Sequence, residues 1–194
     1  MFNENHQTKT HAKESLGFTM NEGNELMNRS FIGEYTDTIY HADGTVEVRE
    51  GRNTIVNGIG KLIACLLKKH EGYSGLGYWA VGSGSEGWDN QSPTPAQPTD
   101  TKCTAEIGRK VINPSDIKFL DESNRETETV TNKIQVTVTF AEGDCNGTWR
   151  EFALFGGNAT SAKDSGIAIN HKTHPIMVKT SSMVVERKIR FTFN

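Results

Sequence analysis

VTNKIQVTVTFAEGDCNGTWREFALF, residues 130–155, is the stretch that decides our prediction of the fold. In its first part, apolar and polar side chains alternate along the chain. The apolar series is Val130, Ile134, Val136, Val138 and Phe140, and the polar series is Thr131, Lys133, Gln135, Thr137 and Thr139. A period of two is typical of a β-strand with one buried face and one wet face.

The rest of the stretch predicts a turn and a second strand. Residues 143–147 contain Gly, Asp and Asn, which tolerate the backbone conformations of tight turns. Beyond them, apolar side chains occupy both sides of the chain. Trp149, Ala153 and Phe155 share one side, and Phe152 and Leu154 share the other. We therefore expect a β-hairpin in the middle of an antiparallel β-sandwich or small barrel, with its second strand covered on both faces.

Other segments fit the same mainly β fold. Residues 33–51 predict a second hairpin that turns at Asp43-Gly44, a strong turn signal. Its charged residues suggest one wet face, and they are Asp37, Glu47, Arg49 and Glu50. Residues 77–81 and 166–172 predict further strands. The chain closes with a strand whose inward side chains are Met183, Val185, Ile189, Phe191 and Phe193.

Residues 53–70 predict the one amphipathic helix of the fold. Apolar side chains recur there at helical spacing and form a single stripe, which we expect to pack on the sheet. The stripe consists of Ile55, Ile59, Leu62, Ile63 and Leu66. Asn53 or Asn57 can act as the N-cap, because an Asn side chain can accept a hydrogen bond from a free backbone N–H.

The chain divides into an arm and a domain. Residues 1–30 are mostly polar and cannot bury enough apolar surface to fold alone. We predict an extended N-terminal arm over residues 1–30 and a β-sandwich domain over residues 31–194. We expect the arm to be held by a neighbouring chain, and the alternative is that it lies on its own domain. The polar loops at 82–101 and 156–165 are long enough to suggest a role in function or assembly.

The composition argues against several classes of partner. The chain has 194 residues and a net charge of −3, which creates no field that attracts nucleic acid or an anionic membrane. No apolar run is long enough to cross a bilayer. Residues 1–14 lack the apolar core of a signal peptide. We therefore expect a soluble protein made in a cytoplasm, with no nucleic-acid and no membrane partner.

The cysteine and histidine residues do not predict a metal or cofactor site. Cys65, Cys103 and Cys145 are an odd number of widely spaced residues, so we expect reduced thiols. His171 and His174 lie three residues apart near the end of a strand, where this spacing places them on opposite faces. We interpret both as surface histidines, because no third ligand lies close in the sequence.

Charged residues in the apolar strands indicate structural contacts instead of catalysis. Glu106 and Arg109 are expected to pair on one strand. Glu151 lies among apolar residues and needs a partner, for which Arg150 or Lys133 is available. No nucleophile stands in a G-x-S-x-G turn. We therefore predict that the protein is not an enzyme; a small hydrolase would require a cleft that holds Glu or His with a shifted pKa.

Aromatic residues offer a possible binding surface. Tyr78, Trp79 and Trp88 are candidate contacts for a glycan or a partner protein, since exposed rings stack on sugars. Trp88 stands alone in a polar loop, where a ring more often anchors the loop than binds a ligand.

The order of the segments over residues 52–194 resembles a group of bacteriophage and prophage virion proteins. The matching pieces are the helix NTIVNGIGKLIACLL, the strand YWAVGSGS, a Pro/Thr-rich loop, Ala105-Glu106 with Arg109, Asn146-Gly147-Thr148 with Glu151 and Leu154-Phe155, and the closing strand IRFTF. Members of that group are tail-fibre or baseplate components, or minor head and decoration proteins. The resemblance implies a non-enzymatic, β-rich assembly module.

The function expected from the residues and the resemblance is that of a structural protein of a phage or phage-like particle. The tail, as a fibre, baseplate or collar component, is the first expectation, and a capsid decoration or head-fibre protein is the alternative. Its partners would be copies of itself and other virion proteins. An alternative of another class is a carbohydrate-binding β-sandwich that recognises a receptor on the host surface.

Overall fold

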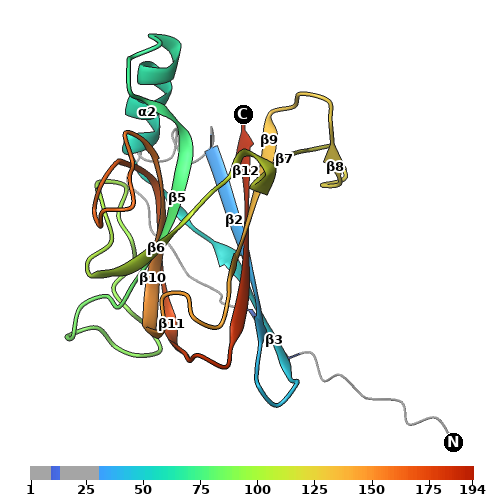
Figure 1. The fold of residues 1–194 in the computed structure, drawn as a ribbon, viewed down its shortest axis with the longest axis vertical. Helices are drawn as coiled ribbons and strands as arrows, with labels where there is room; N and C mark the ends of the chain where they lie inside the picture. The colour runs from blue at the N-terminus through green and yellow to red at the C-terminus, as the bar shows by residue number, and fades with distance from the viewer. Residues whose placement is uncertain (1–9, 14–30) are drawn as a thin grey trace, which may run out of the picture.

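Two β-sheets pack face to face in the computed structural model, which describes residues 31–194 and the backbone of residues 10–13 (Figure 1). The first sheet has the strand order β1-β3-β2-β12-β9-β7-β8, and the second has the order β4-β11-β10-β5-β6. All strand pairs are antiparallel except β1 with β3, which is parallel. The mainly β, two-sheet fold predicted from the sequence is confirmed.

The bounds of the elements follow the sequence patterns. The first sheet contains β1 (Thr10–Lys13), β2 (Phe31–Tyr40), β3 (Val46–Arg52), β7 (Ile117–Leu120), β8 (Glu126–Thr127), β9 (Lys133–Phe140) and β12 (Val184–Phe193). The second sheet contains β4 (Thr54–Ile55), β5 (Ser74–Gly82), β6 (Glu106–Val111), β10 (Gly147–Gly157) and β11 (Ile167–Lys179). The helix α2 (Gly58–Leu67) and a short 3-10 turn (Pro114–Asp116) complete the described elements.

The main core lies between the two sheets. It includes Phe140, Trp149, Phe152, Leu154 and Ile189, all of them fully buried. A second, smaller apolar cluster lies on the outer face of the second sheet, under the loops that cross that face. The second sheet is therefore covered on both faces, which explains why β10 is apolar on both sides.

The predicted hairpin at 130–155 is wrong. Its two strands lie in different sheets, because β9 pairs with β7 and β12 whereas β10 pairs with β5 and β11. Residues 141–146 carry the chain across the core, and the rings of Phe140 and Trp149 meet edge to face there, 4.9 Å apart. The difference in pattern has a physical reason: β9 has one face in water, whereas β10 has neither. Val130 precedes β9 and is exposed.

The second hairpin is confirmed, with one correction. Strands β2 and β3 pair along their length and turn at Asp43-Gly44. Asp37 was expected on a wet face but is 2% exposed. It stands between Tyr35 and Ile39 on the inward side of β2, so its carboxylate lies in the core.

The helix begins later than predicted. Residues 54–55 form strand β4, and α2 starts at Gly58, where a side chain would come within 2.0 Å of the carbonyl oxygen of Ala168. Asn57 occupies the N-cap position, but its side chain makes no capping hydrogen bond. Ile59 and Leu62 face the core as expected. The end of the helix stands clear of the sheets (Figure 1).

Two further observations complete the fold. Among the described residues, no helix is both long enough and apolar enough to span a membrane. The predicted arm at 1–30 lies outside the described residues, apart from Thr10–Lys13. In the single chain these four residues pair with its own strand β3, which corresponds to the alternative that the arm lies on its own domain.

Candidate functional site

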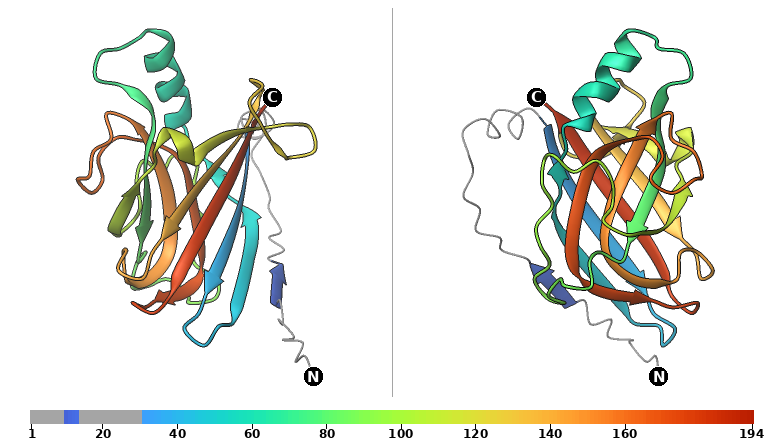
Figure 2. Two further views of the ribbon diagram at one scale, coloured as in Figure 1. Left: turned by 45° about the vertical axis from the view of Figure 1, so that its right-hand side comes forward. Right: turned by 90° about the vertical axis from the view of Figure 1, so that its left-hand side faces the viewer.

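Buried charged residues gather on the outer face of the second sheet. Two long segments cross this face, one from 83 to 105 and the other from 158 to 166 (Figure 2). We call them the first and the second covering loop. Charged side chains of β6, β10 and β11 hold them to the sheet.

Glu151 is the centre of this cluster. Its side chain is 0% exposed, and its carboxylate accepts three backbone N–H groups from the first covering loop. Oε1 accepts from Gly84 at 3.1 Å and from Ala105 at 2.9 Å, and Oε2 accepts from Thr104 at 2.9 Å. One buried carboxylate on β10 therefore fixes both ends of the loop.

His171 supplies the partner that Glu151 needs. Its Nε2 lies 2.9 Å from Oε2 of Glu151, and its Nδ1 lies 2.7 Å from Oδ2 of Asp100 in the first covering loop. The expected partners of Glu151 were wrong. Arg150 points toward a different part of the loop, and Lys133 lies in the other sheet, paired with Glu122.

The ionisation states in this cluster support one another. Burial alone would raise the pKa of Glu151, but hydrogen bonds from His171 and from the amides of Ala105 and Thr104 lower it below its ordinary value. Burial opposes the charged form of His171 as well. The bonds to Glu151 and Asp100 outweigh it and raise the pKa of the imidazole. Between two carboxylates, His171 therefore keeps its proton to a higher pH than an ordinary imidazole does.

Arg150 holds the middle of the first covering loop. Its guanidinium donates to the carbonyl oxygens of Ser85 at 2.8 Å and Trp88 at 2.9 Å, and to the side chain of Asn90. The ring of Trp88 packs on Gly84, where a side chain would come within 2.3 Å of the ring. Trp88 is thus an anchor within its own loop.

The predicted pair of Glu106 and Arg109 is confirmed, and it fixes the second covering loop. Nε and Nη2 of Arg109 donate to the two oxygens of Glu106, both at 2.6 Å. Arg109 also donates to the carbonyl oxygens of Thr160 and Ser165 at 3.0 Å, and Glu106 accepts the N–H of Asp164 at 3.0 Å. These contacts tie β6 to the loop that follows β10.

A bulge in β6 makes this pairing possible. Gly82 lies opposite Glu106 and Val81 lies opposite Gly108, so Ile107 is an extra residue on this strand. The bulge places Glu106 and Arg109 on the same outer face although they are three residues apart. Ile107 packs against the main core instead.

Cys103, Glu151 and His171 have the donor types of a metal site, and their ligand atoms lie within 4.8 Å of one another. The bonding around them does not fit a cation. Both oxygens of Glu151 already accept N–H groups that hold the loop, and His171 uses both of its nitrogens. Burial, followed by the nearby charge of Glu151, raises the pKa of the Cys103 thiol well above its ordinary value, so the thiolate ligand is disfavoured. We interpret the cluster as a network of ion pairs.

The expectation of surface histidines is wrong for both residues. His171 and His174 are each 3% exposed, although they do lie on opposite faces of β11. His174 faces the main core, where its Nε2 lies 3.3 Å from Nη2 of Arg187. Burial and the positive charge of Arg187 hold the pKa of His174 well below its ordinary value.

The core contains an ion pair that the sequence analysis missed. Arg187 of β12 donates from Nε and Nη2 to the two oxygens of Asp37, both at 2.7 Å. Its guanidinium lies 4.4 Å from the ring centre of Phe152 and 5.0 Å from that of Trp149. The signal was present in the sequence, because Arg187 falls on the inward side of a strand that is otherwise apolar on that side.

The three aromatic candidates do not form a common surface. Trp79 is 0% exposed in the main core, so it cannot stack on a ligand. Tyr78 lies on the other face of β5, half-buried, with the guanidinium of Arg109 5.7 Å from its ring centre. The structure therefore removes Trp79 from the predicted contacts, and the other two rings contact different residues, Arg109 for Tyr78 and Gly84 for Trp88.

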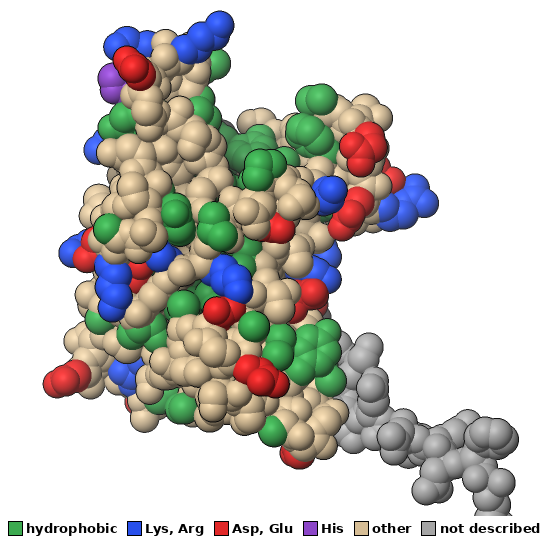
Figure 3. All heavy atoms as spheres, in the orientation of Figure 1, with side chains coloured by type: hydrophobic (Ala, Val, Ile, Leu, Met, Phe, Trp, Pro, Cys, Tyr) green, Lys and Arg blue, Asp and Glu red, His purple; other side chains and the backbone are tan. Residues whose placement is uncertain are grey.

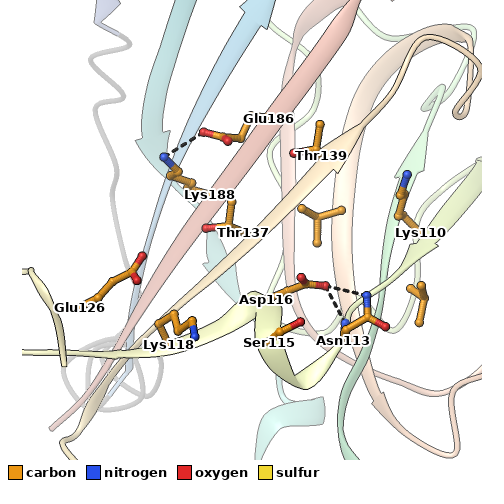
Figure 4. Close-up of a pocket in the computed structure, with 12 residues that line it drawn as sticks. Lys110, Asn113, Ser115, Asp116, Lys118, Glu126, Thr137, Thr139, Glu186 and Lys188 are labelled. Atoms are coloured by element: carbon orange, nitrogen blue, oxygen red, sulfur yellow. Dashed lines mark hydrogen bonds and ion pairs between the residues drawn. The ribbon is translucent and has the colours of Figure 1, made fainter. Parts of the chain in front are cut away.

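An open groove of about 540 Å³ lies where the chain passes from β6 to β7 (Figure 4). Part of its charged lining is paired within the groove: Asp116 accepts the backbone N–H of Asn113 at 2.7 Å, and Lys188 lies 2.8 Å from Glu186. Acidic and basic side chains are interspersed over this face of the molecule (Figure 3). The groove therefore offers a mixed polar surface, without a group of acids that converge on one point.

All three cysteines are free, as expected. Cys103 is buried, and Cys65 and Cys145 are half-buried. This chain matches no family model, no curated protein and no solved structure.

Proposed function

We propose that this protein is a non-enzymatic structural component of a bacteriophage or phage-like particle, joined to neighbouring subunits through its N-terminal arm. A tail component, such as a part of a fibre, baseplate or collar, is our first assignment. A capsid decoration or head-fibre protein is the alternative within the same class.

The observation that carries this proposal is strand β1. Residues 10–13, well before the domain begins at residue 31, add a strand to the edge of β3. A segment that adds a strand to a sheet edge can join separate chains through main-chain hydrogen bonds. The N-terminal region thus contains an element suited to assembly.

The chemistry of the domain supports a structural role as well. A catalytic carboxylate or imidazole must reach a substrate. Glu151 and His171 have shifted pKa values, but both are buried, and their polar atoms hold the first covering loop. Their pKa shifts therefore follow from fixing a loop, and a structural ion-pair network accounts for them.

The order of sequence elements gives the context of the proposal. The resemblance over residues 52–194 is to phage virion proteins, and it implies a β-rich assembly module. The structure adds three features to that picture: two covering loops fixed by buried charges and a helix whose end stands clear of the sheets (Figure 2). Fixed loops suit a surface that must fit a neighbour in one geometry, because little entropy is lost on binding.

Incorporation into particles tests the proposal. The full chain and a variant without residues 1–30 would each be tagged and expressed in cells that produce the particle. We expect the full chain to sediment with particles and the truncated chain to fold but stay in the soluble fraction. Circular dichroism and thermal unfolding of the truncated chain provide the control for folding. Equal incorporation of the two chains would contradict the role of the arm, and absence of both from particles would contradict the proposed function.

A further inference from the structure

We infer that the outer edge of β3 is a strand-accepting edge through which copies of this chain exchange their N-terminal strands. The partner is a second copy, and the segment exchanged is residues 10–13. The exchange deepens the proposed function and rests on it for its setting in a particle.

The first argument is the state of this edge. Strand β3 pairs with β2 on one side over all of its residues, from Val46 to Arg52. On its other side it pairs only with β1, over Glu47–Glu50. Without β1, β3 would be the last strand of the first sheet and would present unpaired N–H and C=O groups, which are a template for another strand.

The second argument is the length of the connection. Residues 14–30 provide 17 residues between Lys13 and Phe31. Lys13 is in register with Glu50, and Glu50 is in register with Thr36. Two strand spacings across the sheet and five residues along β2 therefore separate Lys13 from Phe31. Standard strand geometry makes this about 20 Å. A chain of this length can extend to roughly 55 Å.

That surplus allows two arrangements with the same contacts. The connection can return β1 to its own edge, or it can deliver β1 to the identical edge of an adjacent copy. A domain of this size has a radius of gyration of about 15 Å, so a neighbouring edge lies within reach. A mutual exchange closes a dimer, and a one-way relay closes a ring.

Local concentration decides between the two arrangements. A connection of 17 residues keeps the chain's own strand at an effective concentration on the order of millimolar. Dilute protein is therefore expected to keep β1 on its own edge. Copies held side by side in a particle reach comparable concentrations, and exchange then occurs without any new contact.

The charged character of the edge limits which strands it accepts. Arg49 donates to Glu47 at 2.6 Å, and His41 lies 3.5 Å from the same carboxylate. Charged side chains on an edge strand oppose pairing with arbitrary strands. The occupant that the structure places there is the chain's own segment, which favours a second copy over an unrelated partner.

Cross-linking of register partners tests the inference. His11 is in register with Val48, so a short bismaleimide should join the full-length variant His11→Cys/Val48→Cys within one chain. In a mixture of full-length His11→Cys and full-length Val48→Cys, the same pair can be joined only between chains. Val178 is an exposed valine of the second sheet, and a mixture of His11→Cys with Val178→Cys is the matched control. The parent chain, with its own three cysteines, sets the background.

We expect the His11→Cys and Val48→Cys mixture to give about tenfold more cross-linked dimer than the control at high protein concentration, as expected for a site that raises local concentration. Cross-linking within single chains at every concentration would overturn the exchange, and so would the absence of any product from the double variant. Particles that incorporate the chain without a cross-chain product would contradict the exchange and leave the proposed function standing. A cross-chain product in solution, together with absence of the chain from particles, would support the exchange and contradict the proposed function.

Discussion

Replacing Asp37 with Asn tests the ion pair in the core. The change removes the negative charge that faces the guanidinium of Arg187. Arg187 is 0% exposed, so water cannot replace the lost charge. Removing one partner of a buried ion pair costs about 3–5 kcal/mol of unfolding free energy, because the other charge remains buried and unpaired. For a domain of this size, each kcal/mol lowers Tm by roughly 2–4 °C, so we expect a decrease of about 6–20 °C.

Urea unfolding followed by fluorescence measures this loss, and a matched variant controls for the substitution itself. Glu34 lies on the same strand, exposed, 4.0 Å from Arg52, and Glu34→Gln should change the unfolding free energy by less than about 0.5 kcal/mol. Replacing both members of the buried pair, as Asp37→Leu with Arg187→Met, should restore much of the loss, since no unpaired charge remains. If Asp37→Asn were as mild as Glu34→Gln, the buried ion pair of Asp37 and Arg187 would be refuted.

Three further predictions concern the covering loops. Glu151→Gln should let trypsin cut the first covering loop faster and should lower the free energy of unfolding by about 3 kcal/mol, because charge-assisted hydrogen bonds to the loop amides are lost. Glu86→Gln in the same loop should change neither the cleavage rate nor the free energy of unfolding. His171 has a raised pKa in the folded protein, so its stabilisation is complete below the ordinary pKa of 6.5 and is lost as pH rises through the folded value. The Tm difference between wild type and His171→Gln should therefore shrink toward alkaline pH, and a constant difference would contradict the ion pair. Cys103 should resist iodoacetamide until the protein unfolds, whereas Cys65 should react earlier. Equal alkylation rates of the two cysteines, measured by mass spectrometry, would contradict the burial of Cys103.

Periodicity in the sequence predicted the faces of β9 and β12 well and strand pairing less well. On β10 the prediction that Trp149 shares a side with Ala153 and Phe155 is wrong, because an irregularity between Trp149 and Glu151 turns Trp149 into the main core. The alternation in β9 and β12 identified the inward residues, and the apolar character of β10 on both sides indicated its central place. Periodicity carries no information on which sheet a strand joins. The turn at 141–146 therefore looked like a hairpin, whereas it connects two sheets across the core.

Buried charges were the least predictable part of the candidate site. Asp37 looked like a surface residue because its partner, Arg187, lies 150 residues away in the sequence. His174 looked like one because its contact with Arg187 joins two different strands, β11 and β12, that belong to different sheets. Asp100 had no signal of its own within a Pro-rich loop, and its role depends on the fold bringing it to His171. By contrast, Glu106 and Arg109 were predictable because both belong to one strand.

The protein composition of purified particles tests the central claim most directly. Particles from cells that carry this gene would be purified by density gradient and then by ion exchange, and the chain would be quantified against a known virion protein by mass spectrometry. Our account predicts a fixed number of copies per particle that is unchanged by the second purification step. A chain that remains in the soluble fraction, or whose ratio to the virion protein falls at each step, would contradict it.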